Sequence, residues 1–172
     1  MGRPVLATLV LLACLAGCAK GPPPRVWAAS VCQALSPWRA EIATLTTTAQ
    51  QQTPQSTTPE QAKDNLVRML EGARDATEKA RGEVEAAGVP EVQDGKTIAA
   101  KMTESLTKVR DAYGKARDTV DALPTADSDR FYKGVQAAMV TLQQEYAASA
   151  LDTTNLRSTE LQAAFAEAPE CH

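Results

Sequence analysis

The stretch AAKMTESLTKVRDAYGKARDTVDAL, residues 99–123, has the most regular hydrophobic pattern of the chain. Its apolar residues recur at alternating spacings of three and four: Ala99, Met102, Leu106, Val109, Tyr113, Ala116, Val120 and Leu123. This spacing places them on one side of an α-helix and is typical of helices packed lengthwise on one another. Asp94 is placed to cap such a helix and Pro124 to end it. We therefore expect a helix over about residues 94–123.

Two similar patterns precede this helix. Residues 26–51 carry the stripe Val31, Leu35, Trp38, Ile42 and Leu45, and Pro37 interrupts it, so we expect a kink where Ser36 and Pro37 could start a second piece. The Gln- and Thr-rich residues 50–57 read as a loop. Thr58-Pro59-Glu60-Gln61 is a capping-box sequence that opens the next helix, and Gly88 and Pro90 end it.

The last pattern begins at Asp127-Ser128-Asp129 and continues to Ala168, before Pro169. It weakens near residues 152–158, and we favour one long helix with an irregularity there over the alternative of two helices. Four helices joined by short loops predict an all-α fold, an antiparallel up-down four-helix bundle. In that topology the first and last residues of the domain lie at the same end.

The chain begins with Met1-Gly2-Arg3-Pro4 and an apolar run from Val5 to Leu15. One basic residue, a short apolar core and small residues after it are typical of an export signal, since a membrane-spanning helix needs ~20 apolar residues. A myristoylation signal needs Ser or Thr at position 6, where this chain has Leu6, so N-terminal myristoylation is disfavoured.

Leu15-Ala16-Gly17-Cys18 resembles the lipobox of bacterial lipoproteins. The resemblance implies cleavage before Cys18, a diacylglyceryl thioether (palmitate or a similar acyl chain) on its sulfur, and a place on the extracytoplasmic face of the cell membrane. Two acyl chains suffice for stable anchoring. The alternative is an ordinary secretory signal that happens to contain a cysteine. We expect a signal peptide over residues 1–17, a lipidated, Pro-rich tether of roughly 20 Å over residues 18–25, and a helical domain over residues 26–172.

Four cysteines occur, and the expected processing accounts for two of them. Cys14 leaves with the signal and Cys18 carries lipid, so Cys32 and Cys171 remain. Exported proteins meet an oxidising compartment, so we expect a disulfide between Cys32 and Cys171 rather than two free buried thiols. An even number of antiparallel helices also places these two residues at the same end. A metal site is disfavoured, since two Cys and one His fall short of a tetrahedral set.

Composition and motifs argue against several functions. Loss of Arg3 lowers the basic residues from 18 to 17, against 21 acidic ones, and this acidic balance disfavours nucleic acid as a partner. The single histidine is the last residue, His172, and no catalytic, nucleotide-binding or metal-binding motif occurs. We therefore expect no enzyme activity, no catalytic residues, no cofactor and no metal. Asp127 and Asp129 are better explained by a helix cap than by calcium.

Trp27 and Trp38 are about three helical turns apart on nearly one face. Core packing against the last helix is favoured over an exposed patch near the membrane anchor. Glu83, Glu85 and the acids that follow them read as a solvated helix end.

The layout of lipobox, short Pro-rich tether, Ala-rich helices and terminal cysteine pair resembles small uncharacterised actinobacterial lipoproteins. We expect a non-enzymatic, membrane-anchored envelope lipoprotein that acts as a surface or interaction module with an envelope protein partner. The alternative is a carrier that binds an apolar or lipid ligand between its helices, in a cavity near Leu106, Val109 and Leu142. A third hypothesis, an accessory subunit of a cell-wall enzyme, predicts the same sequence features as the interaction module.

Overall fold

The computed structural model describes residues 21–52, 58–149 and 158–172. These residues form α1 (Pro24–Gln51), α2 (Pro59–Ala86), α3 (Gly95–Asp121), α4 (Ser128–Ala148), α5 (Thr159–Glu167) and a short 3₁₀ helix (Pro169–Cys171), and they contain no strand. The expected all-α class is confirmed. The leader and the lipobox lie outside the described residues.

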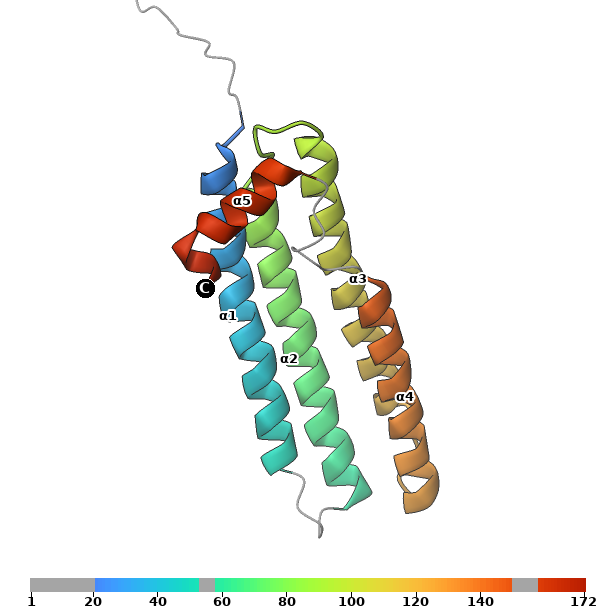
Figure 1. The fold of residues 1–172 in the computed structure, drawn as a ribbon. Helices are drawn as coiled ribbons and strands as arrows, with labels where there is room; N and C mark the ends of the chain where they lie inside the picture. The colour runs from blue at the N-terminus through green and yellow to red at the C-terminus, as the bar shows by residue number, and fades with distance from the viewer. Residues whose placement is uncertain (1–20, 53–57, 150–157) are drawn as a thin grey trace, which may run out of the picture.

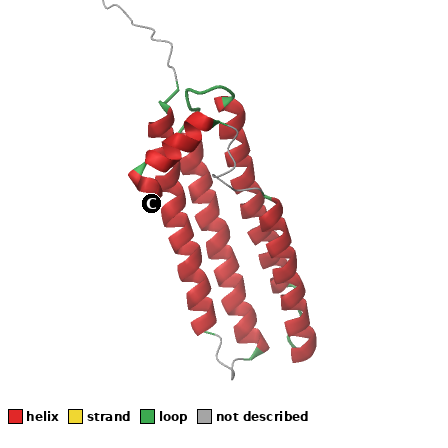
Figure 2. Cartoon of the chain, viewed as in Figure 1, coloured by secondary structure: helices red, strands yellow, loops and turns green. Residues whose placement is uncertain are grey.

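The axes of α1 to α4 run along the long direction of the molecule, and α5 lies across them (Figure 1). Successive helices from α1 to α4 run in alternating directions, and α5 crosses over the end of the molecule where α1 begins. α2 packs against both α1 and α3, α4 packs mainly against α3, and α5 and the 3₁₀ helix pack against α1. Figure 2 shows that the described part of the chain is almost entirely helical, with short loops and turns between the helices.

The single long helix expected over residues 127–168 is wrong. α4 ends at Ala148, and the hydroxyl of the buried Ser149 donates to the Tyr146 carbonyl at 2.7 Å. A side chain that bonds its own backbone in this way competes with continued helix. α5 starts separately after Ser158, whose hydroxyl accepts from the Leu161 amide. The described part of the chain thus holds five α-helices, and the expected four-helix bundle is not confirmed.

The expected kink at Pro37 does not divide the first helix, because α1 runs unbroken through it. Pro37 and Gln33 are both exposed, so the carbonyl that loses its hydrogen bond can be solvated. On the other side of the helix Leu35 and Trp38 are buried. Packing of that buried face keeps α1 helical on both sides of the proline.

The ends of α2 are formed as the sequence indicates. The Thr58 hydroxyl accepts from the Gln61 amide and the Gln61 side chain accepts from the Thr58 amide, both at 3.3 Å, which is the capping box. Gly88 takes the left-handed conformation, with φ of 76°. Asp94 stands at the N-cap position of α3, but its side chain makes no capping hydrogen bond and its own φ is 60°.

The core lies between α1, α2 and α3, with α4 and α5 covering different parts of it. Its fully buried large side chains are Trp27, Val31, Leu35, Leu70, Leu106, Val109, Val120, Phe131 and Leu161. α4 supplies only Phe131 and Ala138 to the buried set. The stripe expected on residues 99–123 is buried at Met102, Leu106, Val109, Tyr113, Ala116 and Val120, as predicted.

Candidate functional site: the tethered end and an open apolar groove

Cys32 and Cys171 are joined by a disulfide, with their sulfur atoms 2.04 Å and their Cα atoms 5.1 Å apart. The expected pairing is confirmed. The route by which Cys171 arrives differs from the expectation, because α5 and the 3₁₀ helix, not the end of α4, carry it to α1. The Ser36 hydroxyl, which donates to the Glu170 carbonyl at 3.5 Å, adds a second link there.

Both tryptophans belong to the core, as favoured from the sequence, but each packs against a different neighbour. Trp27 is fully buried, lies edge-on to Phe165 of α5 at 5.9 Å between ring centroids, and donates from Nε1 to the Gly88 carbonyl at 2.9 Å. Trp38 donates from Nε1 to the buried Thr77 hydroxyl of α2 at 3.0 Å. Trp27 therefore ties the start of α1 to both α5 and the loop over residues 87–94.

The last residues of the expected tether are folded onto the protein. α1 begins at Pro24 rather than near residue 26. The Glu91 amide donates to the Pro22 carbonyl at 3.0 Å, and a Cβ on Gly21 would lie 1.8 Å from the Val89 carbonyl oxygen. Only glycine allows this approach. Cys18, the expected lipidation site, lies outside the described residues, three positions before Gly21.

An apolar groove of about 310 Å³ lies open on the surface between α1, α3 and α4. Its lining residues are Ile42, Tyr113, Met139, Leu142, Gln143 and Tyr146. The groove exists because α4 packs on α3 rather than on α1. Met139 and Leu142 are only partly buried, and Tyr146 is 40% exposed.

Tyr113 forms the inner wall of this groove and is mostly buried. Burial disfavours the charged phenolate, and the nearby Tyr146 adds to the effect, so the pKa of Tyr113 rises to about 12. The phenol is therefore neutral at physiological pH. It can offer a bound partner an O–H donor but no charge.

A cluster of charges links α2 to α3 elsewhere on the surface. Glu78 accepts from Arg81 at 2.7 Å and from Arg110 of α3 at 2.8 Å. These hydrogen bonds to the carboxylate lower the pKa of Glu78 to about 2. The cluster links the two helices and lies apart from the groove, whose lining residues carry no charge.

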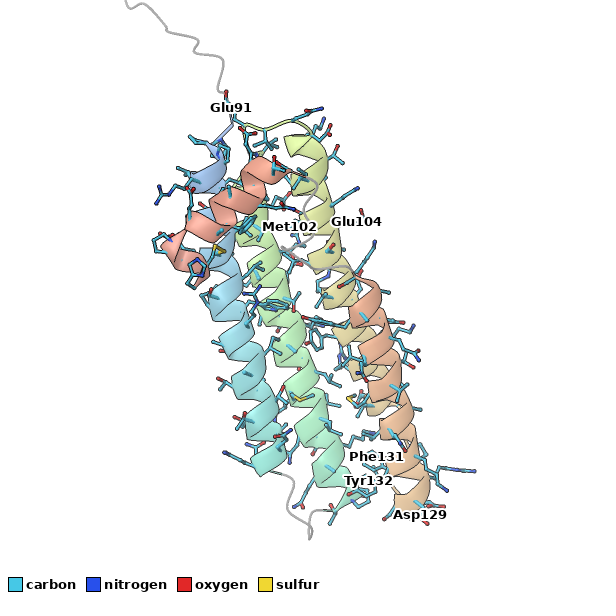
Figure 3. All side chains as sticks on the ribbon, in the orientation of Figure 1. Glu91, Met102, Glu104, Asp129, Phe131 and Tyr132 are labelled. Carbon is cyan, nitrogen blue, oxygen red and sulfur yellow. A yellow bond between two sulfur atoms is a disulfide. The ribbon has the colours of Figure 1, made fainter. Side chains whose placement is uncertain are left out.

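The other residues singled out from the sequence lie apart from the groove. Asp127 caps α4 by accepting from the Arg130 amide at 3.0 Å, as expected. Asp129, Phe131 and Tyr132 lie at the opposite end of the molecule from Glu91 (Figure 3). His172 is exposed, and its Nε2 lies 3.0 Å from the Ala166 carbonyl oxygen. Glu85 pairs with Arg81 at 2.8 Å.

Two negative findings apply to residues 21–52, 58–149 and 158–172. No helix there is both long and apolar enough to cross a membrane. No group of three or more His, Cys, Asp or Glu side chains is placed there to hold a metal ion.

No protein-family model matches the sequence, and comparisons with curated proteins and with solved structures found no match.

Sequence reasoning missed both the docking of residues 21–23 and the groove. Gly21 before three prolines was a signal for the first, because a glycine is what a close backbone approach requires. For the groove, the sequence shows an apolar stripe on α4, but it does not show that α1 leaves part of this stripe uncovered. An apolar stripe on a helix ordinarily faces the core, so the pattern alone does not indicate an open groove.

Proposed function

We propose that this protein is a bacterial envelope lipoprotein, held to the extracytoplasmic face of the cell membrane by lipid on Cys18, whose helical domain binds another envelope protein. It performs no catalysis and needs no cofactor. The apolar groove between α1, α3 and α4 is the binding surface. The single observation that carries the proposal is that Met139, Leu142 and Tyr146 lie partly exposed in a groove that no other described helix covers.

The chemistry of the groove suits a protein partner. Aromatic residues and methionine are enriched at protein interfaces, where the thioether adapts to irregular surfaces and tyrosine combines an apolar ring with a polar tip. The groove offers Met139, Tyr113 and Tyr146, together with the amide of Gln143. An apolar helix face with one or two polar side chains is the matching occupant.

The lipid anchor is supported by the leader and lipobox. We also propose to regard the domain as a modified antiparallel four-helix bundle, in which α4 covers one half of the fourth position and α5 crosses the other half. This division leaves the groove open next to α4 and brings the C-terminus to the anchored end.

The carrier alternative is less well supported. Leu106 and Val109, which would line an internal ligand cavity, are fully buried in the core, and Leu142 faces an open groove. The groove, at about 310 Å³, and a second depression lined by Leu142, at about 390 Å³, are at the small end of ligand pockets, which span ~300–1,000 Å³.

The test is photo-crosslinking in the living bacterium, with a photoreactive amino acid at Gln143. Gln144 is the matched control, because it is the next residue of α4, is exposed, and does not line the groove. We expect one defined cross-linked protein from position 143 and none from 144, and Met139→Lys should abolish it.

Equal cross-linking from both positions would contradict the groove as the binding surface. Native mass spectrometry of the same purified protein tests the carrier. A stoichiometric lipid that Met139→Lys removes would favour the carrier over the interaction module.

A further inference from the structure

The residues that join the lipidated cysteine to the domain are docked on the protein, and this docking limits how far the domain can stand from the membrane. The Glu91 amide holds the Pro22 carbonyl, and Gly21 lies in van der Waals contact with the backbone of Val89. The ring of Pro22 also lies against Gly88, where a Cβ would be 3.8 Å from Pro22 Cδ. Residues 21–23 thus form part of the surface made by the loop over residues 87–94.

Only Ala19 and Lys20 stand between Cys18 and the docked Gly21. Three steps of extended chain span at most ~11 Å, since each residue adds no more than ~3.6 Å. A lipid on Cys18 therefore holds the loop over residues 87–94 close to the headgroups. The free part of the tether therefore reaches at most about half as far as the composition of residues 18–25 indicates, because its proline-rich part belongs to the folded domain.

Two large apolar side chains are exposed at this end of the molecule. Val26 is 53% exposed and Val89 is 44% exposed. The hydrogen bond from Trp27 to Gly88 joins the residues next to them, so both valines lie at the same end of the molecule. Near the valines in the sequence, the exposed residues Arg25, Glu91, Asp94 and Lys96 provide charges of both signs, as suits a headgroup region. In Figure 3, Glu91 lies at the end of the molecule where α1 begins.

We propose that this end of the domain, with Val26 and Val89 at its centre, rests on the lipid surface and fixes the orientation of the domain on the membrane. The inference depends on the proposed anchor at Cys18. The occupant of this surface is the membrane to which the chain is attached. The end that carries Phe131 and Tyr132 then points away from the membrane.

The test uses the full-length lipidated protein, purified from a bacterium and reconstituted into vesicles of phosphatidylcholine and phosphatidylglycerol. Val89→Cys is labelled with an environment-sensitive fluorophore, since the other cysteines are held in the disulfide or carry lipid. Val140→Cys on α4 is the matched control, because Val140 is 47% exposed and lies on a different surface. A headgroup-attached quencher should quench the probe at position 89 several-fold more strongly than the probe at position 140.

Two further variants separate docking from anchoring. Gly21→Ala should undock the tether, because its Cβ would collide with the Val89 carbonyl. A ten-residue Gly-Ser insertion after Lys20 keeps the docking intact but adds roughly 18 Å of root-mean-square reach. Both variants should still float with vesicles, and both should lose most of the quenching at position 89.

The outcomes distinguish this inference from the proposed function. Flotation with vesicles but equal quenching at positions 89 and 140 overturns the fixed orientation and leaves the anchor standing. Strong quenching at position 89 that survives the insertion shows that the tether length does not set the contact, and this also overturns the inference. Failure of the unsubstituted protein to float contradicts the anchor itself.

Discussion

Thr77 is the residue whose hydrogen bonds couple α1 to α2 in the core. Its hydroxyl is fully buried, accepts from Trp38 Nε1 at 3.0 Å and donates to the Ala73 carbonyl at 2.7 Å. A buried indole N–H without an acceptor is costly. The pairing explains how a tryptophan and a threonine are both accommodated in an otherwise apolar interior.

We expect Thr77→Val, which keeps the shape of the side chain, to lower the free energy of unfolding by about 1–3 kcal/mol, because it leaves the Trp38 N–H unpaired. Urea unfolding followed by tryptophan fluorescence measures the change. Thr119→Val is the control, since Thr119 is exposed and bonds only the Lys115 carbonyl of its own helix. Equal losses in the two variants would mean that the Trp38 pairing adds nothing.

The sequence predicts that the tryptophans are in the core but not the atoms that satisfy them. Helical periodicity indicates which face of α1 is buried, and it holds for Trp27 and Trp38. The acceptors are the Gly88 carbonyl and the Thr77 hydroxyl, 61 and 39 positions away in the sequence. No local pattern encodes such partners.

The glycines of α2 show how closely neighbouring elements approach. A Cβ on Gly72 would lie 2.9 Å from a terminal methyl of Leu45 in α1, whereas a Cβ on Gly82 would meet nothing within 4 Å. Gly72 therefore permits the close packing of α1 on α2. Gly82 has no such role.

Gly82→Ala should raise the free energy of unfolding by about 0.5–1 kcal/mol, the usual gain from replacing glycine inside a helix. Gly72→Ala should gain clearly less, or lose stability, because Leu45 must move aside. Chemical denaturation of the two variants in parallel gives the comparison. An equal gain at both positions would show that the contact with Leu45 places no demand on residue 72.

Charge links between elements give a pH dependence. The pKa of Glu78 in the folded protein is about 2, below the ordinary value of 4.5, because Arg81 and Arg110 donate to the carboxylate. A carboxylate with a lowered folded-state pKa stabilises the protein fully above the ordinary pKa and loses that contribution as the pH falls. Glu78 thus contributes stability above pH 4.5 that disappears between pH 4.5 and about 2.

Glu78→Gln should therefore be less stable than the unsubstituted protein at pH 7, and the difference should shrink as the pH falls toward 2. Unfolding midpoints measured across this pH range test it. In the control Glu104→Gln, the lost partner is Lys108 on the same helix, so a smaller difference is expected. A Glu78→Gln difference that does not change with pH would contradict the assignment.

At the scale of elements, sequence reasoning succeeds where helix signals are local and fails where they depend on tertiary contacts. The capping box of Thr58 and the left-handed Gly88 are local, and both are formed. The unbroken helix at Pro37 depends on burial of the opposite face of α1. The position of α5, separate from α4, depends on its contact with Trp27 and on the disulfide to Cys32 that follows it. An irregularity near residues 152–158 can be predicted, but the crossing of α5 over α1 cannot.

Among the residues that the structure describes, one disulfide joins residue 32 near the start of the fold to residue 171 near its end. In the unfolded chain this link closes a loop of 139 residues, for which the chain-entropy model gives about 5 kcal/mol of stabilisation. The core is thin in aromatic side chains, at 4% of the sequence. A large share of the net stability therefore resides in the disulfide.

Cys32→Ser and Cys171→Ser should each lower the free energy of unfolding by about 2–5 kcal/mol. At about 2–4 °C per kcal/mol for a domain of this size, the melting temperature should fall by roughly 4–20 °C. Calorimetry of the two variants checks both the size and the equality of the effect, since either one breaks the same bond. Melts that match the oxidised unsubstituted protein would mean that the link is unimportant for stability.

The lipid anchor on Cys18 is tested most directly by the mass of the mature N-terminal peptide of the protein purified from bacterial membranes. Tryptic cleavage after Lys20 should release the three residues 18–20 with a diacylglyceryl group on the sulfur of Cys18. That mass is the predicted result, and Cys18→Ser should remove it and release the protein from the membrane. A peptide that retains residues 1–17, or one with an unmodified Cys18, would contradict the lipid anchor.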